Sequence, residues 1–139
     1  MDETTREPAI RVLMMPRDTN PAGTIFGGVI LSYIDQAGAE EAKLHGMGPR
    51  LVTVAMKEVV FRKPVFVGDL VSFYTSLVRA GTTSVTVAVK VVAARRADRN
   101  TRALVTSAEL TFVNLDEEGR PAPLDRGSTK THLGPRGGS

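Results

Sequence analysis

The sequence has no cysteine and no tryptophan, and aromatic side chains make up only 5% of its 139 residues. Without cysteine, the fold has neither a disulfide framework nor a thiolate metal site. The two histidines, His45 and His132, stand far apart in the sequence, which makes a histidine metal cluster unexpected as well. We therefore expect no bound metal.

Long apolar runs are also missing. No stretch approaches the roughly 18 consecutive apolar residues that a membrane-spanning helix needs. Residues 1–10 are charged and lack the apolar centre of a signal peptide. These absences predict a soluble, cytoplasmic protein with no membrane partner.

The body of the chain lacks an excess of charge of either sign. The pI of about 9.6 suggests nucleic-acid binding at first sight. However, residues 1–118 carry 14 basic and 14 acidic side chains, and the whole excess lies in residues 119–139. Duplex binding relies on a basic surface, and single-strand binding relies on aromatic side chains that stack on bases. Nucleic acid is therefore not an expected partner.

One segment stands out among what is present. Residues 20–46 begin with turn-forming residues and continue in an apolar, helix-like pattern that Gly46 ends. On a helical wheel one face would carry Phe26, Ile30, Tyr33, Ile34, Ala37 and Leu44. Asp35 lies at the edge of this face among small residues, which leaves room for another molecule to approach it.

The rest of the pattern has a period of two and indicates strands. A short strand is predicted over 11–15 and longer ones over 51–61, 70–78, 85–91 and 103–113. In the last strand one side would carry Leu104, Thr106, Ala108, Leu110 and Phe112. One long helix followed by these strands predicts an α+β domain, with an antiparallel sheet that packs on the helix. The edge strands of so small a sheet favour pairing with a second copy, and hence a homodimer.

Composition also divides the chain. Residues 1–9 are expected to be a flexible N-terminus, and residues 10–116 the folded domain. Residues 117–139 are rich in glycine, proline and arginine, and large apolar residues are scarce. Such a segment buries too little surface to offset its ordering entropy, so we expect a disordered or loosely attached tail.

Gly27 and Gly28 open the predicted helix. The first amides of a helix have no internal acceptor, and glycine lets a ligand oxygen approach them, as in an oxyanion site. Alternatively, the two glycines only allow close packing of helix on sheet. Asp35 is either a solvated surface charge or a general base or nucleophile that faces a cleft.

Spacing bears on these alternatives. Gly28 and Asp35 are seven residues apart, which is roughly 10 Å along a helix. One reacting carbonyl would therefore struggle to touch both groups of the same helix. If both act on one substrate, the amides and the carboxylate come from different subunits.

Other polar residues also have two interpretations. Asn20 either holds the turn before the glycines or orients a water or a substrate carbonyl. Arg62 and Lys63 are either a solvated pair or contacts for phosphates. Thr83 and Ser84 either only close a hairpin or line a binding site.

Three motifs in order resemble a known family. N-x-x-G-x-x-F-G-G, with an aspartate further on, is met by Asn20, Gly23, Phe26, Gly27, Gly28 and Asp35. K-P-V-x-V-G-D is met by residues 63–69, and G-x-x-S by Gly81 and Ser84. Over residues 10–116 the sequence resembles the hotdog-fold acyl-CoA thioesterases, especially the bacterial YciA-type subgroup.

The resemblance implies a helix wrapped by a curved antiparallel sheet, dimers that often assemble as trimers of dimers, and hydrolysis of acyl-CoA without a cofactor. Asp35 would be the general base or nucleophile, and the Gly27 and Gly28 amides would polarise the thioester carbonyl. Asn20 of the partner subunit would place water and substrate. We assign substrate contacts to Phe26, Arg62, Lys63, Thr83 and Ser84.

Members of this subgroup often carry a basic residue where Thr82 stands here, so the CoA phosphates would rely more on Arg62, Lys63 or other basic residues. The alternatives are a hotdog dehydratase, which would need a cleft histidine, and a non-catalytic acyl-CoA sensor. A purely structural oligomer is a further alternative, which Gly27 and Gly28 beside an apolar cleft argue against.

Overall fold

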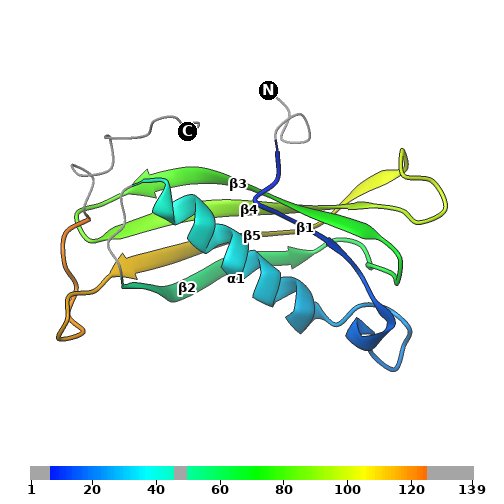
Figure 1. Cartoon of the computed structure of the whole chain (residues 1–139), viewed down its shortest axis with the longest axis horizontal. Helices are drawn as coiled ribbons and strands as arrows, with labels where there is room; N and C mark the ends of the chain where they lie inside the picture. The colour runs from blue at the N-terminus through cyan, green and yellow to red at the C-terminus, as the bar shows by residue number, and fades with distance from the viewer. Residues whose placement is uncertain (1–6, 46–49, 125–139) are drawn as a thin grey trace.

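A computed structural model describes residues 7–45 and 50–124 of the chain (Figure 1). In chain order its elements are β1 (Ile10–Leu13), the short 3-10 helix η2 (Pro16–Asp18), α1 (Gly27–Lys43), β2 (Leu51–Phe61), β3 (Leu70–Ala80), β4 (Ser84–Ala94) and β5 (Arg102–Asn114). The strands form one antiparallel sheet in the order β1-β3-β4-β5-β2, and α1 lies across one face of it. The predicted α+β architecture is confirmed. Within the described residues, no helix has the length and apolar character to cross a membrane.

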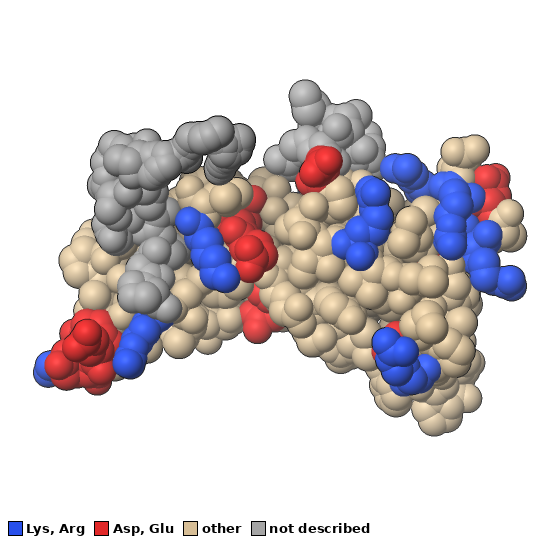
Figure 2. All heavy atoms as spheres, viewed as in Figure 1, with Lys and Arg blue, Asp and Glu red and all other residues tan. Residues whose placement is uncertain are grey.

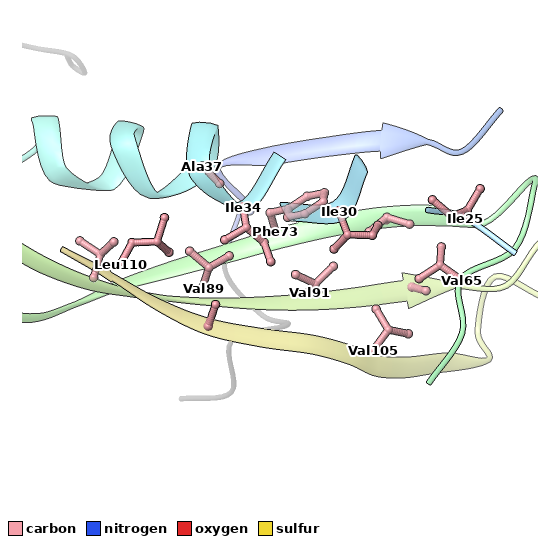
Figure 3. Packing of buried hydrophobic residues seen from close by; sticks show 14 of the residues in the cluster. Ile25, Ile30, Ile34, Ala37, Val65, Phe73, Val89, Val91, Val105 and Leu110 are labelled. Carbon is pink, nitrogen blue, oxygen red and sulfur yellow. The ribbon is translucent and has the colours of Figure 1, made fainter. Parts of the chain in front are cut away.

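The core lies between α1 and the sheet (Figure 3). From the sheet, β4 contributes four valines spaced two apart, all fully buried: Val85, Val87, Val89 and Val91. From the helix come Ile30, Ile34 and Ala37, at most 2% exposed. Fully burying an aliphatic side chain of this size contributes about 1.5–3 kcal/mol, so these contacts hold the helix in one orientation.

Phe26 and Leu44 were predicted on the buried face of the helix, but neither lies on that face. The helix begins at Gly27 and ends at Lys43, so it is shorter than predicted. Phe26 is the N-cap residue, with non-helical backbone angles, and its side chain is 47% exposed. Leu44 is the C-cap residue and is 72% exposed. The wheel prediction was wrong for both because neither belongs to the regular helix.

The predicted face of β5 is wrong at Leu104, because a β-bulge shifts the alternation of side chains there. Val91 pairs with Thr106, but Val92 pairs with Leu104, so Val105 is an extra residue in β5. At such a bulge two consecutive side chains turn to the same side of the sheet. Val105 and Thr106 are both fully buried, whereas Leu104 is 38% exposed.

The segment 64–69 is the loop that supports the start of the helix. Its Asp69 is buried and accepts hydrogen bonds from Arg95 Nη1 at 2.6 Å and from the Phe66 amide at 2.9 Å. Val65 in turn accepts a hydrogen bond from the Ile25 amide just before α1. Much of the K-P-V-x-V-G-D motif is therefore structural, because this loop positions the N-terminus of α1.

The first part of the predicted tail folds back on the sheet. Asp116 closes a turn with Arg120, the Ala122 amide donates to the Asn114 carbonyl, and the Leu124 amide donates to the Thr82 carbonyl. Composition did not predict that residues 117–124 are ordered, because hydrogen bonds rather than a large apolar surface hold them. The rest of the predicted tail, residues 125–139, lies outside the described residues, as do residues 1–6 of the predicted flexible N-terminus.

Gly68 is a position where we expect substitution to be costly. Its φ is +89°, and a Cβ atom there would lie 2.3 Å from Arg96 Cδ. Gly68→Ala should therefore lower the free energy of unfolding by about 2–4 kcal/mol, through left-handed backbone strain plus the clash. Urea denaturation measures this change.

Gly119→Ala is the matched control, because Gly119 has a φ of +85° but nothing within 4 Å of the added atom. It should cost only about 1 kcal/mol. Equal destabilisation by the two changes would show that contact with Arg96 adds nothing.

Candidate active site

The turn that precedes α1 is held by Asn20. Its Oδ1 accepts a hydrogen bond from the Thr24 amide at 3.1 Å, and its Nδ2 donates to Thr24 Oγ1 at 3.0 Å. The Asn20 amide also donates to the Thr24 carbonyl at 2.7 Å. Both ends of the side-chain amide therefore serve the turn, which supports the structural interpretation of Asn20 within one chain. Its catalytic role stays a prediction.

Gly27 and Gly28 differ in what surrounds them. A Cβ atom at Gly27 would lie 3.3 Å from Cζ of Phe61, so close packing against β2 accounts for this glycine. A Cβ atom at Gly28 would meet nothing within 4 Å. Packing within one chain therefore gives no reason for glycine at position 28. A glycine in a helix costs stability relative to alanine, so the open space suggests that something outside the chain approaches there.

The amides at this end of α1 are available as donors. No side chain caps the helix, and the backbone hydrogen bonds of its first turn start at the Val29 amide. Neither the Gly27 nor the Gly28 amide has an acceptor among the described residues. With the positive end of the helix dipole beside them, these amides are suited to bind an oxygen that becomes negative, and this role stays a prediction.

Asp35 lies on the flank of α1 that faces the edge of the sheet. Its Oδ1 accepts a hydrogen bond of 2.6 Å from the hydroxyl of Thr53 on β2. Asp35 is half-buried and Thr53 is exposed, since β2 is an edge strand of the sheet. The hydrogen bond orients the carboxylate and leaves Oδ2 without a partner among the described residues. Such a carboxylate is suited to act as a general base or as a nucleophile.

A cavity of about 220 Å³ opens beside the first turns of the helix. Its walls are mostly apolar, with Arg62 and Lys63 among its lining residues, and the rest are Ile30, Phe61, Pro64, Val65 and Thr106. Thr106 Oγ1 is buried and has no hydrogen-bond partner among the described residues. The cavity therefore combines apolar walls with two basic side chains and one buried hydroxyl that is unpaired within the described residues.

The predicted substrate contacts do not meet in one chain. Arg62 lies near Val105, to whose carbonyl its amide donates, and its Nη2 donates to Ser107 Oγ at 2.9 Å. Thr83 and Ser84 lie at the other end of the sheet, where Ser84 pairs with Val113. Eight residues of strand separate these two places on β5, which is about 26 Å.

Sequence reasoning missed Thr53 and Thr106. Thr53 lies 18 positions after Asp35, and no local period connects a helix residue with a strand residue at that separation. Thr106 was predicted only to share one side of the last strand with four apolar residues. What distinguishes it is an unused hydroxyl beside a bulge, and no motif marks that.

A helix that packs on a five-stranded antiparallel sheet, with open amides at its N-terminus, is the hotdog arrangement. The model of the Thioesterase superfamily matches residues 22–99. The acyl-CoA thioester hydrolase YciA of Salmonella typhimurium is 40% identical over 127 residues, which covers 89% of this chain and 95% of that protein.

Solved structures agree with this match. A hexameric hotdog-fold thioesterase of Campylobacter jejuni has a TM-score of 0.78 and 45% identity, covering 86% of this chain and 90% of that one. An Asp-to-Ala mutant of a hexameric, broad-specificity acyl-coenzyme A thioesterase has a TM-score of 0.81 and 38% identity, covering 88% and 89%. The chain belongs to the thioesterase superfamily and has the hotdog fold.

The contact between Thr53 and Asp35 predicts the effect of a conservative change. Thr53→Val keeps the shape and the strand preference of the side chain but removes the donor. We expect kcat for thioester hydrolysis to fall about tenfold with little change in KM, because a hydrogen bond to a charged group contributes about 1.5–3 kcal/mol. Steady-state assays of thiol release measure both constants.

Thr53→Ser is the control, since it keeps the hydroxyl and should retain most of the turnover. Wild-type kcat in Thr53→Val would show that the hydrogen bond has no part in the reaction.

Proposed function

We propose that this protein is an acyl-CoA thioesterase, which hydrolyses the thioester of acyl-CoA to a free carboxylic acid and CoA. The main support is the Asp35–Thr53 pair on a hotdog fold, in a chain 40% identical to an acyl-CoA thioester hydrolase over most of both lengths. Family membership supplies the reaction class, and the pair supplies a carboxylate placed for it.

The proposed reaction adds water across the C–S bond. As general base, Asp35 takes a proton from water while the water oxygen attacks the carbonyl carbon. As nucleophile, Asp35 attacks the carbon itself, and water then hydrolyses the resulting anhydride. In both cases the Gly27 and Gly28 amides stabilise the carbonyl oxygen as it becomes negative, and the sulfur leaves with the CoA. The step as written draws on no metal or cofactor.

The two halves of this site belong to different subunits in our proposal. Gly28 and Asp35 lie about 10 Å apart along one helix, too far for one carbonyl to reach both. Thr53 and Phe61 lie near opposite ends of β2, and Phe61 packs on Gly27. Antiparallel pairing of two β2 strands about their middle would bring Thr53 close to the partner's Phe61. Asp35 of one subunit would then face the helix N-terminus of its partner.

The edge of the sheet at β2 has the features of such an interface. The strand is 11 residues long, and it has a neighbour, β5, on only one side. Four of its apolar side chains are between 37% and 56% exposed: Val52, Val54, Val60 and Phe61. A long apolar edge of this kind is an aggregation risk unless another strand covers it. We infer a dimer through β2, and the hexameric relatives support a trimer of such dimers.

The cavity beside the helix N-terminus supports acyl-CoA as the substrate. Its apolar walls fit an acyl chain or the pantetheine arm, and Arg62 and Lys63 offer positive charge toward phosphates. Phe26, half exposed at the start of the helix, is a further apolar contact. The placement of Thr83 and Ser84 at the far end of the sheet means that they would join a site only from another subunit.

The rival enzyme class finds less support. A dehydratase would need a histidine in the cleft, but the ring of His45 bonds Glu41 at 2.7 Å near the other end of the helix. His45 follows Gly28 by 17 residues, or about 25 Å along the helix axis. A sensor without turnover is the alternative that the assays below test. A cytoplasmic location stays a prediction.

A panel of acyl-CoA substrates of increasing chain length tests the proposed function directly. The wild-type protein should release free thiol from at least part of the panel. Asp35→Asn should lose about 10²-fold or more of kcat, because asparagine keeps the shape and can accept from Thr53 but is not a base. Circular dichroism checks that the variant is folded. A folded wild-type protein that binds CoA esters and hydrolyses none is a sensor.

Mixed oligomers test the shared site. Asp35→Asn and Gly28→Ala subunits are each assayed alone, unfolded together, and refolded as a mixture. Gly28→Ala should fold normally, because nothing lies within 4 Å of the new methyl group, yet it should be weakly active since the methyl group hinders approach to the amide.

If one site draws on two subunits, half of the sites in a mixed dimer are intact. Random mixing should then restore about a quarter of the wild-type turnover. Activity no higher than the mean of the two variants, in dimers verified to be mixed, would place the whole site within one subunit.

A further inference from the structure

The outer face of the sheet, opposite the helix, carries a small basic pocket. Its volume is about 110 Å³, and its polar lining consists of Arg11, Ser72, Tyr74, Arg99 and Arg102. The rest of the lining is apolar: Leu70, Val92 and Ala94. The pocket is on the outer face because the strand residues that alternate with Ser72 and Tyr74, namely Val71 and Phe73, belong to the core under the helix.

The register of the sheet brings these residues together. Arg11 on β1 pairs with Ser72 on β3, Ser72 pairs with Val92 on β4, and Arg102 on β5 pairs with Ala94. Arg99 comes from the loop between β4 and β5. In Figure 2, basic side chains gather at the end of the molecule where Figure 1 shows this loop. Five separate segments therefore build one pocket.

Two of the arginines are held in place by the fold. Arg11 Nε donates to Ser72 Oγ at 2.8 Å. Arg99 Nη1 donates to the Gly68 carbonyl at 2.8 Å and to the Ala94 carbonyl at 2.9 Å. Each guanidinium keeps further N–H groups for a ligand, because arginine has five donors. Arg99 is thus positioned before a ligand binds.

The other two donors, Tyr74 and Arg102, are unpaired within the part of the chain that the structure describes. Tyr74 is only 3% exposed as a whole residue, but its hydroxyl oxygen is not fully buried, and it makes no hydrogen bond with a described residue. Arg102 has neither a hydrogen bond nor an ion pair with a described residue. Because Tyr74 lines the pocket, its unpaired hydroxyl is available to a group that enters there.

Negative charge is missing from the pocket. None of its lining residues is acidic. Asp69, at the end of the loop before β3, is already paired with Arg95, and Asp98 is used by the Asn100 amide and the Thr101 hydroxyl within its own turn. Three guanidinium groups around one small space repel one another unless an anion lies between them. Planar guanidinium groups match the geometry of phosphate oxygens in particular.

We propose that this pocket binds one phosphate group, through Arg11, Arg99, Arg102 and the Tyr74 hydroxyl. The pocket is too small for a whole nucleotide, so a larger ligand would place only a phosphate in it. The sheet separates the pocket from α1 and from Asp35, so the bound phosphate is not at the reacting thioester. The phosphate belongs either to acyl-CoA held by another subunit or to a separate phosphate compound, and the experiment distinguishes these two sources.

Pyrophosphate is the probe, titrated into the intact protein at low salt and followed by calorimetry and by the melting temperature. The wild-type protein should bind it saturably, and its melting temperature should rise. Arg102→Gln and Tyr74→Phe should each weaken binding about tenfold, as expected for loss of one hydrogen bond to a charged group. Tyr74→Phe changes no charge, so it separates a built pocket from general attraction.

Arg79→Gln is the matched control. Arg79 is an exposed arginine near the other end of β3 and does not line the pocket, so this change removes the same charge elsewhere. It should leave the affinity for pyrophosphate unchanged. Absence of saturable binding to the wild-type protein, or equal weakening in Arg79→Gln and Arg102→Gln, would overturn the proposal.

The source of the phosphate follows from the acyl-CoA kinetics of the same variants. If the phosphate belongs to the substrate, Arg102→Gln should raise KM for acyl-CoA about tenfold and leave kcat unchanged. If the ligand is separate, KM should stay unchanged while pyrophosphate affinity falls. Pyrophosphate binding is measured without turnover. Its result therefore tests the phosphate pocket independently of the proposed hydrolase activity.

Discussion

The packing of one helix face on the valines of β4 is the constraint on which the rest of the structure depends. Ile30, Ile34 and Ala37 are buried against that face, which sets both the rotation and the position of α1. With this rotation, Asp35 points to the β2 edge, where Thr53 meets it. The loop at 64–69 then sets where the helix begins, since Val65 accepts the Ile25 amide. The core therefore sets the orientation of Asp35 and of the helix N-terminus, although no core residue is assigned a role in the proposed reaction.

The same rigid helix explains why the proposed site needs two subunits. A straight helix cannot bring its first amides and a carboxylate two turns later to one atom. In the proposed dimer, the long apolar edge at β2 binds a second copy on the side where Asp35 lies. An edge strand that is costly to leave exposed thus becomes the element that completes the proposed site. Catalysis and assembly would depend on the same strand.

The motifs that suggest the family divide into structural and chemical parts. Gly68 and Asp69 belong to the loop that holds the helix N-terminus, and Asn20 bonds within its own turn. Gly28 has open space beside it that packing within one chain does not fill, and Asp35 uses only Oδ1 for a hydrogen bond among the described residues. The outer face of the sheet carries a separate cluster of basic residues, which belongs to none of these motifs. A motif match in this fold is therefore evidence for the scaffold first and for its chemistry second.

The sequence by itself determined the elements and the central helix, because hydrophobic period and turn residues are local properties that α1 and the strands follow closely. It also indicated Gly28 and Asp35 as candidates, and their spacing along one helix predicted two subunits for any site that uses both. Only the tertiary structure decided that Thr53 bonds Asp35 and that Leu104 turns outward at a bulge. It also decided that residues 117–124 fold back and that three arginines share a pocket. These features depend on strand register and on contacts between residues far apart in the chain, and no local pattern in the sequence encodes them.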